Sequence, residues 1–411
     1  MWRFKFYGFF KNLRFFEPFL LLIFLAWDVN LFQIGILIAI QEAIIFIFEV
    51  PSGLLADNRG KKTELLICFI FYIISFVFYF LGPAYIMLIG GAIFFGLGEA
   101  FRSGTHKAME MQWMEKEGLL EYKTFIYGTT RSYSLYGSAI SSVLAIVFIL
   151  NLPASRWIFI ITIIPYVVDF ILIASYPSYM NKHVYKGEKL SYLRELIDSF
   201  KSLKIIFTDK RLRKGIFSSS SYNATFKSLK DYIQPIMKIL IVVLLISFSL
   251  NPQDEEFYLV FILGLIYTIF YLISSISSKN AHKIQNNFKS SKSAMDWLFY
   301  FFAIIVLLQA FFIWYEIPIL IIVLYLLIYV LYNARKPIGV DYLGDLMDKE
   351  QRATILSVEA QLKSILVMIF APIFGYIAEY YSIAILFLSL SIFMFLLNFI
   401  LLRNHSTSVV I

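Results

Sequence analysis

A short basic turn lies between two long apolar segments, 33–56 and 63–81, in the stretch Glu49-Val50-Pro51-Ser52-Gly53-Leu54-Leu55-Ala56-Asp57-Asn58-Arg59-Gly60-Lys61-Lys62. Each apolar segment is long enough to cross the hydrocarbon core of a bilayer as an α-helix, which takes ~20 residues. A helix also satisfies its own backbone hydrogen bonds, which a single strand in lipid does not. The stretch therefore predicts two membrane-spanning helices joined by a charged turn at the membrane surface.

The same pattern of apolar segments continues along the chain. Of its 411 residues, 60% are apolar and 16% are charged, against about 25% charged residues in soluble domains. This composition excludes an ordinary soluble enzyme and predicts an all-α polytopic membrane protein, embedded in the lipid bilayer, with twelve transmembrane helices. The segments long enough to span the membrane are 15–30, 33–56, 63–81, 84–101, 124–149, 155–176, 215–236, 256–277, 295–314, 317–334, 353–377 and 380–402.

The basic residues predict the orientation of these helices. Lys and Arg gather in the cytoplasmic loops of membrane proteins, and 30 of the 36 in this chain fall in alternate connections, beginning with residues 1–14. We therefore expect both termini on the cytoplasmic side of the cell membrane. These loops account for the net charge of +8, so no nucleic-acid partner is predicted. No small-residue cleavage site follows the first apolar run, which indicates a retained first span.

The chain divides into two halves at one long polar connection. Residues 177–214 carry ten basic residues and separate six spans from six, so we predict bundles at 1–176 and 215–411 with a cytoplasmic linker between them. The sequence Trp113-Met114-Glu115-Lys116 after the fourth span is echoed by Leu346-Met347-Asp348-Lys349 after the tenth. Repeated six-span halves are typical of transporters that rock around a site at the repeat interface.

The basic turn resembles a known family motif. The signature loop of the major facilitator superfamily has the same pattern at the same place, and the residues that match it are Gly53, Asp57, Arg59, Gly60, Lys61 and Lys62. The resemblance implies two pseudo-symmetric six-helix bundles, in which this motif holds a cytoplasmic gate closed. Arg102, at the end of the fourth span, is assigned to the same gate. The stretches 98–105 and 352–357 look like prokaryotic exporter-type members.

Some features of the family are missing from this sequence. The loop of the second half that matches the gating motif, 274–289, keeps basic residues but has no Gly-Asp-Arg-Gly arrangement. Ala92 stands where many proton-coupled relatives have an arginine in the fourth span, and the fifth span lacks the Gly-Pro-rich pattern of antiporters. The family motifs therefore give no support for proton antiport. The support for proton antiport comes from the acidic residues within the spans.

Charged side chains within membrane spans are costly, at least ~2.5–3.5 kcal/mol each on insertion scales, and usually face a cavity or a partner. Glu42 lies roughly 13 Å along the second span, at 1.5 Å of helix per residue, which is near the middle of the membrane. A carboxylate there is a candidate for exchanging a proton as the cavity wets and dries. The alternative is an ion pair with Arg131 of the fifth span.

A polar stripe with helical spacing runs along the seventh span and comprises Lys227, Lys230, Asp231 and Gln234. Because spans 1, 4, 7 and 10 line the central cavity in the superfamily, the resemblance implies that this stripe faces substrate. Glu359 and Lys363, at i and i+4 in the eleventh span, allow the same interpretation. In both spans the alternative is an internal ion pair, Lys227 with Asp231 or Glu359 with Lys363.

Together these features favour a secondary transporter that works by alternating access. It would export a small compound, which includes lipophilic compounds, in exchange for protons. The alternative is an uptake permease or uniporter for a polar metabolite. The four histidines lie in cytoplasmic segments, and no zinc-protease, hydrolase or nucleotide-binding motif occurs. We therefore expect neither an enzyme nor an ATP-driven pump, and we expect no cofactor. The single cysteine, Cys68, excludes a multi-cysteine metal site; a monomer without bound metal is predicted.

Overall fold

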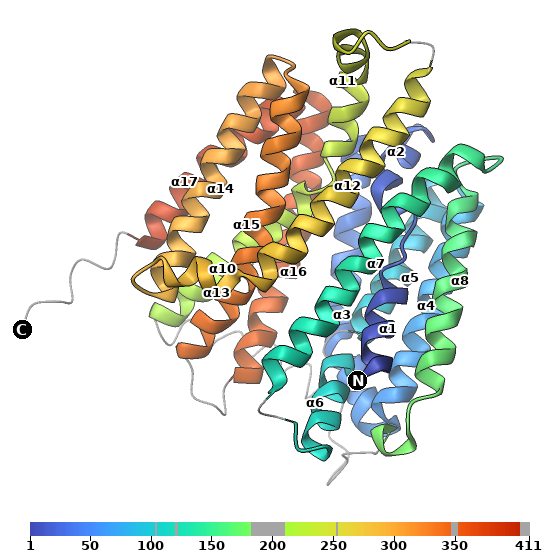
Figure 1. The fold of residues 1–411 in the computed structure, drawn as a ribbon, viewed down its shortest axis with the longest axis vertical. Coiled ribbons are helices and arrows are strands. Elements are labelled where there is room, and N and C mark those ends of the chain that lie inside the picture. The colour runs from blue at the N-terminus through green and yellow to red at the C-terminus, as the bar shows by residue number, and fades with distance from the viewer. Residues whose placement is uncertain (103–104, 120–121, 182–209, 252–253, 347–351, 403–411) are drawn as a thin grey trace, which may run out of the picture. The chain divides into compact units, whose positions relative to one another are not determined.

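The computed structural model describes residues 1–411 except 103–104, 120–121, 182–209, 252–253, 347–351 and 403–411. The described residues form helices and no β-strand (Figure 1). In the first part of the chain the helices are α1 (Trp2–Lys11), η1 (Glu17–Phe19), α2 (Leu20–Leu25), α3 (Leu31–Arg59), α4 (Lys61–Leu81), α5 (Tyr85–Arg102), α6 (Thr105–Lys116), α7 (Lys123–Asn151), α8 (Trp157–Ala174) and η3 (Ser178–Asn181). In the second part they are α10 (Lys210–Leu229), α11 (Ile233–Ser247), α12 (Glu255–Lys279), α13 (Ala281–Asn286), α14 (Ser291–Trp314), α15 (Pro318–Asp345), α16 (Arg352–Tyr380) and α17 (Ile383–Leu402).

Ten stretches of the described residues are helical, long and apolar enough to cross a membrane. They lie in α3, α4, α5, α7, α8, α12, α14, α15, α16 and α17. The first and seventh predicted spans differ from these, because each corresponds to two shorter helices, α1 with α2 and α10 with α11. The predicted first span, 15–30, holds η1 and α2, and α1 precedes it from Trp2 as a separate helix.

The chain divides into two compact units. Unit 1 comprises Met1–Val29, Leu37–Lys201 and Tyr267–Leu272, and unit 2 comprises Asn30–Ile36, Ser202–Ile266 and Ile273–Ile411. Most of the predicted linker 177–214 lies outside the described residues. The bundle boundaries predicted from the sequence therefore stay a prediction.

Unit 1 is built on close contacts between helices. The helix α1 packs against α7 and α8, and α4 packs against α5 and α8 (Figure 1). A Cβ atom added at Gly137 of α7 would collide with the backbone carbonyl of Phe9, and one at Gly98 of α5 would lie 2.8 Å from the ring of Tyr72. Small residues at such contacts let helix backbones approach closely, which is how helices in lipid gain packing energy.

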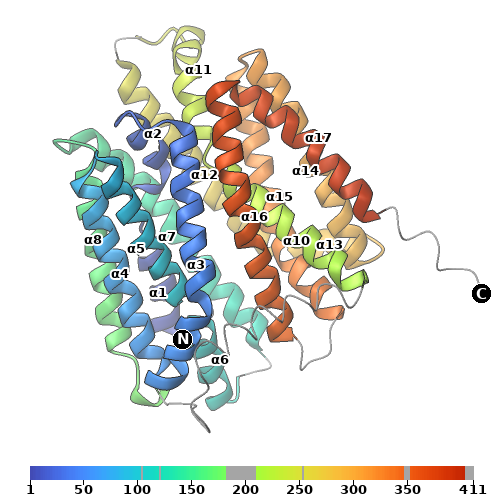
Figure 2. The ribbon, with the colours of Figure 1, turned by 180° about the vertical axis from the view of Figure 1, so that it is seen from behind.

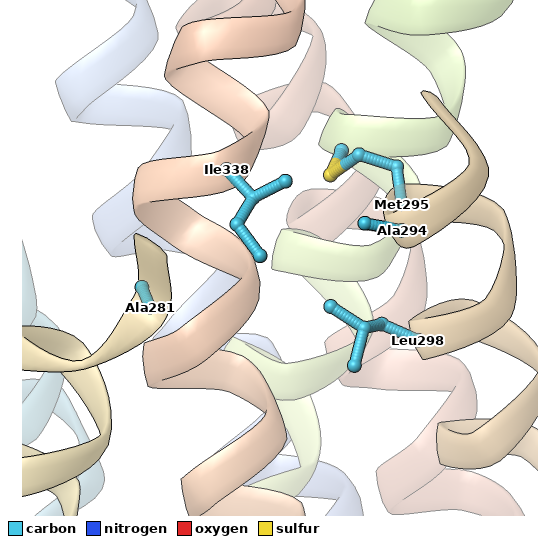
Figure 3. Packing of buried hydrophobic residues seen from close by; sticks show 5 residues of the cluster. All are labelled: Ala281, Ala294, Met295, Leu298 and Ile338. Atoms are coloured by element: carbon cyan, nitrogen blue, oxygen red, sulfur yellow. The ribbon is translucent and has the colours of Figure 1, made fainter. Parts of the chain in front are cut away.

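Unit 2 has its own packed core. The helix α14 packs against α15 and α17, and α10 packs against α15 and α16 (Figure 2). A buried cluster joins α13, α14 and α15, and Figure 3 shows its members, Ala281, Ala294, Met295, Leu298 and Ile338. The Met295 backbone carbonyl also accepts a hydrogen bond from Arg335 Nε (3.3 Å). This packing fixes the C-terminal half of α15 against its neighbours.

Gly137→Ala is expected to lower the apparent melting temperature of the purified protein, because its methyl group meets the Phe9 backbone. Overpacking of this kind costs ~1–3 kcal/mol. Gly128→Ala in the same helix is the matched control, since a Cβ atom at Gly128 meets no described atom within 4 Å. Thermal unfolding in detergent measures both variants, and equal melting temperatures would contradict a tight contact between α1 and α7.

Candidate functional site

The first membrane helix of unit 1 is interrupted between α1 and η1. At the end of α1, Asn12 Nδ2 donates to the Gly8 carbonyl (2.6 Å), and Tyr166 Oη of α8 donates to the Lys11 carbonyl (3.0 Å). A helix end within a membrane protein leaves carbonyls without helical partners, and these side chains replace them. The break also positions Arg14, whose Nε donates to Tyr166 Oη (2.8 Å).

A group of charged side chains gathers at this break. The Glu99 carboxylate of α5 lies 2.6 Å from Arg14 Nη2, 2.6 Å from Arg102 Nη2 and 3.8 Å from Lys11 Nζ. We call Lys11, Arg14, Glu99 and Arg102 the first-helix charge cluster. Its side chains are between 11% and 31% exposed, and the Arg14 guanidinium also lies over two aromatic rings. Three cations thus surround one carboxylate in this cluster, and the aromatic faces partly stabilise the charge of Arg14.

Part of the predicted gating motif joins α4 to the end of α8. Gly60, with a φ of +92°, precedes α4, and Asn181 Oδ1 accepts from the backbone amides of Lys62 (3.1 Å) and Thr63 (3.2 Å). The Lys62 ammonium group donates to the carbonyl of Ala174 (2.6 Å), the last residue of α8. An amide oxygen at a helix N-terminus and a cation at a helix C-terminus are both favourable caps. Gly60 and Lys62 thus have a structural role within unit 1.

The other motif residues have less enclosed positions. Gly53 lies on an exposed part of α3, and a Cβ atom there would meet no described atom within 4 Å. Arg59 is exposed at the end of α3, and Lys61 is half-buried. Asp57 belongs to α3, but its side chain lies outside the described residues. The gate assigned to this motif and to Arg102 stays a prediction, and within unit 1 Arg102 belongs to the first-helix charge cluster.

The first helix of the second half is also interrupted, between α10 and α11. Lys230 Nζ and Asp231 Oδ2 form an ion pair of 2.7 Å in the break. The hydroxyl groups of Tyr325 and Tyr329 on α15 donate to the carbonyls of Leu229 (3.5 Å) and Lys230 (3.4 Å), respectively. The Leu229 carbonyl also accepts from the Tyr232 backbone amide (3.0 Å), so Tyr325 adds to a backbone hydrogen bond, whereas Tyr329 gives the Lys230 carbonyl a side-chain partner.

This interruption corrects the predicted polar stripe of the seventh span. Lys227 lies on α10 and is half-buried, whereas Gln234 lies on α11 and is buried. Lys230 and Asp231 lie in the break between these helices. The four residues therefore do not share the face of one continuous helix, because the helical spacing that the stripe assumed ends at Leu229.

Glu359 of α16 lies against α10 in unit 2. Its Oε1 accepts from Ser219 Oγ and from Asn223 Nδ2, each at 2.9 Å. We call Ser219, Asn223 and Glu359 the α10–α16 polar cluster. Lys363, one turn further along α16, is half-buried, and the alternative ion pair of Glu359 with Lys363 is not formed between these described side chains. Hydroxyl, amide and carboxylate groups are thus available together for a polar ligand.

Glu42 and Arg131 both belong to unit 1. Glu42 is buried in α3, at 0% exposure, and Arg131 is half-buried in α7. Both stay candidates for binding protons or substrate, and the ion pair between them stays a prediction. Within the described part of the chain, no three His, Cys, Asp or Glu residues lie together as metal ligands.

Sequence reasoning counted three enclosed cations as loop charges: Lys11 and Arg335, which are buried, and Arg14, which is half-buried. Arg335 is 2% exposed in α15, where its Nη2 donates to Ser218 Oγ (2.8 Å) and its guanidinium carbon lies 4.1 Å from the ring centroid of Tyr222. The offset that aligns 113–116 with 346–349 also aligns Arg102 with Arg335. That register was a usable signal, because it places a basic residue at the same point of the fourth helix in each half.

Membrane-spanning helices, an interrupted first helix in each half, and buried or half-buried ionisable groups at both interruptions are typical of a multi-pass membrane transporter. The family model of the Major Facilitator Superfamily matches residues 9–358. The chain belongs to this superfamily and has its all-α fold of twelve transmembrane helices in two six-helix halves. The membership of this superfamily that the sequence predicted is thereby confirmed.

Individual relatives agree with this assignment. The chain is 26% identical over 240 residues to the uncharacterized MFS-type transporter YxaM of Bacillus subtilis (strain 168), a match that covers 54% of each protein. Among solved structures, a mutant of the nucleoside transporter NupG is similar with a TM-score of 0.76 at 14% identity, over 98% of both chains. A POT family transporter in complex with 5-aminolevulinic acid has a TM-score of 0.72 at 13% identity, over 98% of this chain and 94% of its own. These structures share the fold.

Glu99→Gln leaves the three cations of the first-helix charge cluster without their carboxylate. We expect a lower apparent melting temperature, since removing one partner of a buried ion pair costs about 3–5 kcal/mol. Glu117→Gln, which changes an exposed residue after α6, is the control and is expected to stay within about 0.5 kcal/mol of the unmodified protein. If Glu99→Gln melts like the control, the carboxylate does not hold Arg14 and Arg102 in place.

Proposed function

We propose that this chain is a secondary active transporter that works by alternating access and couples the efflux of a small compound to proton exchange. The observation that carries the proposal is the pair of interrupted helices, α1 with α2 and α10 with α11. Transporters built from repeats bind substrate and coupling ions at discontinuous helices in corresponding positions of their halves. Here each break holds an ion pair, Arg14 with Glu99 and Lys230 with Asp231.

In this proposal the predicted site residues fall into two groups with different roles in the transport cycle. The motif from Gly53 to Lys62, together with Arg102, stabilises the closed cytoplasmic gate. The side chains that bind protons or substrate are Glu42, Arg131, Lys227, Asp231, Gln234, Glu359 and Lys363. The exporter-type stretches 98–105 and 352–357 favour efflux as the direction, and a lipophilic compound is one class of cargo.

A second candidate function is uptake or uniport of a polar metabolite. The α10–α16 polar cluster supports it, because a carboxylate flanked by a hydroxyl and an amide suits a solute with several hydrogen-bonding groups. The names of two structures with this fold, a nucleoside transporter and a complex with 5-aminolevulinic acid, supply polar test compounds. The two candidates differ in direction and in cargo, so one assay separates them.

In this proposal the protein works as a monomer in the cytoplasmic membrane, with both termini and the linker 177–214 inside the cell. The alternation of basic loops supports this orientation. Reaction of single cysteines introduced at exposed positions with a membrane-impermeant thiol reagent tests it. Glu117→Cys and His282→Cys are expected to react only after the membrane is opened.

Transport by the purified protein in proteoliposomes tests class, direction and coupling together. Counterflow and efflux of labelled uridine, 5-aminolevulinic acid and ethidium are measured with and without a pH gradient. We expect saturable transport driven by the gradient, slower transport in Asp57→Asn, and counterflow without gradient-driven movement in Glu42→Gln. Asp254→Asn, which removes an exposed carboxylate before α12, is the control and is expected to behave like the unmodified protein.

Other outcomes of the same assay would change the proposal. A transport rate that is the same with and without the pH gradient would contradict proton coupling and would favour a uniporter. Accumulation of uridine or 5-aminolevulinic acid, without movement of ethidium, favours uptake of a polar metabolite. A flux that does not saturate identifies a channel.

Glu359→Gln tests the part of the α10–α16 polar cluster in binding. The amide keeps an oxygen that accepts from Ser219 and Asn223 but loses the negative charge. For a polar cargo we expect the half-saturation concentration to rise about tenfold, the effect of ~1.4 kcal/mol of lost binding. Unchanged half-saturation in the proteoliposome assay would place the cluster outside the binding site.

A further inference from the structure

Asp169 of α8 is a buried acidic residue that neither the gate nor the candidate site uses. Its side chain is 0% exposed, and neither carboxylate oxygen has a hydrogen-bond partner among the described residues. No described cation lies within ion-pair distance of it either. Enclosing an ionised carboxylate without hydrogen bonds or a counter-charge is far more costly than enclosing a neutral carboxyl group. The protonated form is therefore the one that this environment accepts.

The surroundings of Asp169 connect it to the interrupted first helix. Lys11 and Tyr7 of α1, and Tyr176 just after α8, are close enough to interact with it electrostatically. Tyr7 Oη is likewise buried without a hydrogen-bond partner among the described residues. The other titratable side chains described on helices packed against α8, none of them hydrogen-bonded to Asp169, are Arg3 and Lys5 on α1, Lys61, Lys62, Glu64, Cys68, Tyr72 and Tyr79 on α4, and Tyr127, Arg131, Tyr133 and Tyr136 on α7.

Lys11 is placed to act on two carboxyl groups. It lies 3.8 Å from Glu99, which is already held at 2.6 Å by both Arg14 and Arg102. Glu99 therefore keeps its two close partners when Lys11 moves away. Lys11 is also the last residue of α1, directly before the break, so a movement of α1 changes its distance from Asp169. A cation that approaches a carboxyl group favours release of its proton.

We propose that Asp169 is a proton-binding site that sets the conformational equilibrium of the transporter, under the control of Lys11. In the described conformation the carboxyl group holds its proton. When α1 moves and the Lys11 ammonium group turns from Glu99 to Asp169, the carboxyl O–H bond breaks and the proton passes to water. The carboxylate that remains pairs with Lys11. This inference rests on the proposed proton coupling and names a residue that carries the proton.

Infrared difference spectroscopy of the purified protein tests the bound proton without any cargo. We expect the C=O stretching band of a protonated carboxyl group in the unmodified protein at neutral pH. The band is expected to disappear in Asp169→Asn and to persist in Asp254→Asn, whose exposed carboxylate makes no capping hydrogen bond. A spectrum that Asp169→Asn leaves unchanged overturns the proposal.

Distances between two spin labels test the link to conformation. Labels are attached at Glu117→Cys in unit 1 and His282→Cys in unit 2, both exposed, with the buried Cys68 replaced by serine. The distance distribution is expected to shift between acidic and alkaline pH. Asp169→Asn, which imitates the protonated acid, is expected to keep the acidic distribution throughout. Lys11→Gln is expected to move the midpoint of the shift to higher pH, because the carboxyl group then keeps its proton longer.

The outcomes separate this proposal from the proposed function. A normal shift in Asp169→Asn overturns the role of Asp169, even where a pH gradient drives transport. A lost shift in Asp169→Asn, with Asp254→Asn normal, supports it. Where a pH gradient fails to drive transport in proteoliposomes, the proposed proton coupling is wrong, and the infrared band and label distances still decide whether Asp169 holds a proton linked to conformation.

Discussion

Backbone amides and carbonyls inside lipid need hydrogen-bond partners within the protein, and this constraint governs most of the structure. Uninterrupted helices such as α4 and α14 meet it alone. The two interrupted helices need side chains from neighbours, and tyrosines provide them: Tyr166 of α8 at the first break, Tyr325 and Tyr329 of α15 at the second. The breaks therefore depend on the helices beside them, because moving Tyr166 or Tyr329 away would remove a hydrogen bond from the Lys11 or Lys230 carbonyl.

The same cost applies to charged side chains, and the chain meets it in several ways. Glu99 is surrounded by cations, and Arg335 is satisfied by Ser218, a backbone carbonyl and an aromatic ring. These two arrangements have different electrostatic consequences. The first keeps opposite charges in contact, whereas the second bonds a cation to neutral groups, with Asp296 and Glu359 near enough to act on it electrostatically. Asp169 has neither an ion-pair partner nor a hydrogen-bond partner among the described residues. Its protonation state therefore bears on the function of the protein.

The family motif also carries local structure. Gly60 supplies the positive φ before α4, and Lys62 binds the end of α8 while Asn181 binds the start of α4. A change at either position therefore acts on the packing of unit 1 as well as on any gate. Activity measurements on the motif are best read beside a stability measurement, since loss of a helix cap alone costs about 0.5–2 kcal/mol.

The sequence by itself determined the ten uninterrupted spans, the helical class and the superfamily, because the length and apolarity of a segment and the spacing of the basic turn are local properties. It also named Arg102 and Glu359 as candidate site residues. However, it predicted one continuous polar stripe in the seventh span, and it counted Arg14 and Arg335 as loop charges. Only the tertiary structure decided those points. Whether a helix is interrupted, and whether a charge near its end is buried, depends on which neighbouring helices bring tyrosines, serines or carboxylates to that place, and sequence spacing does not contain that information.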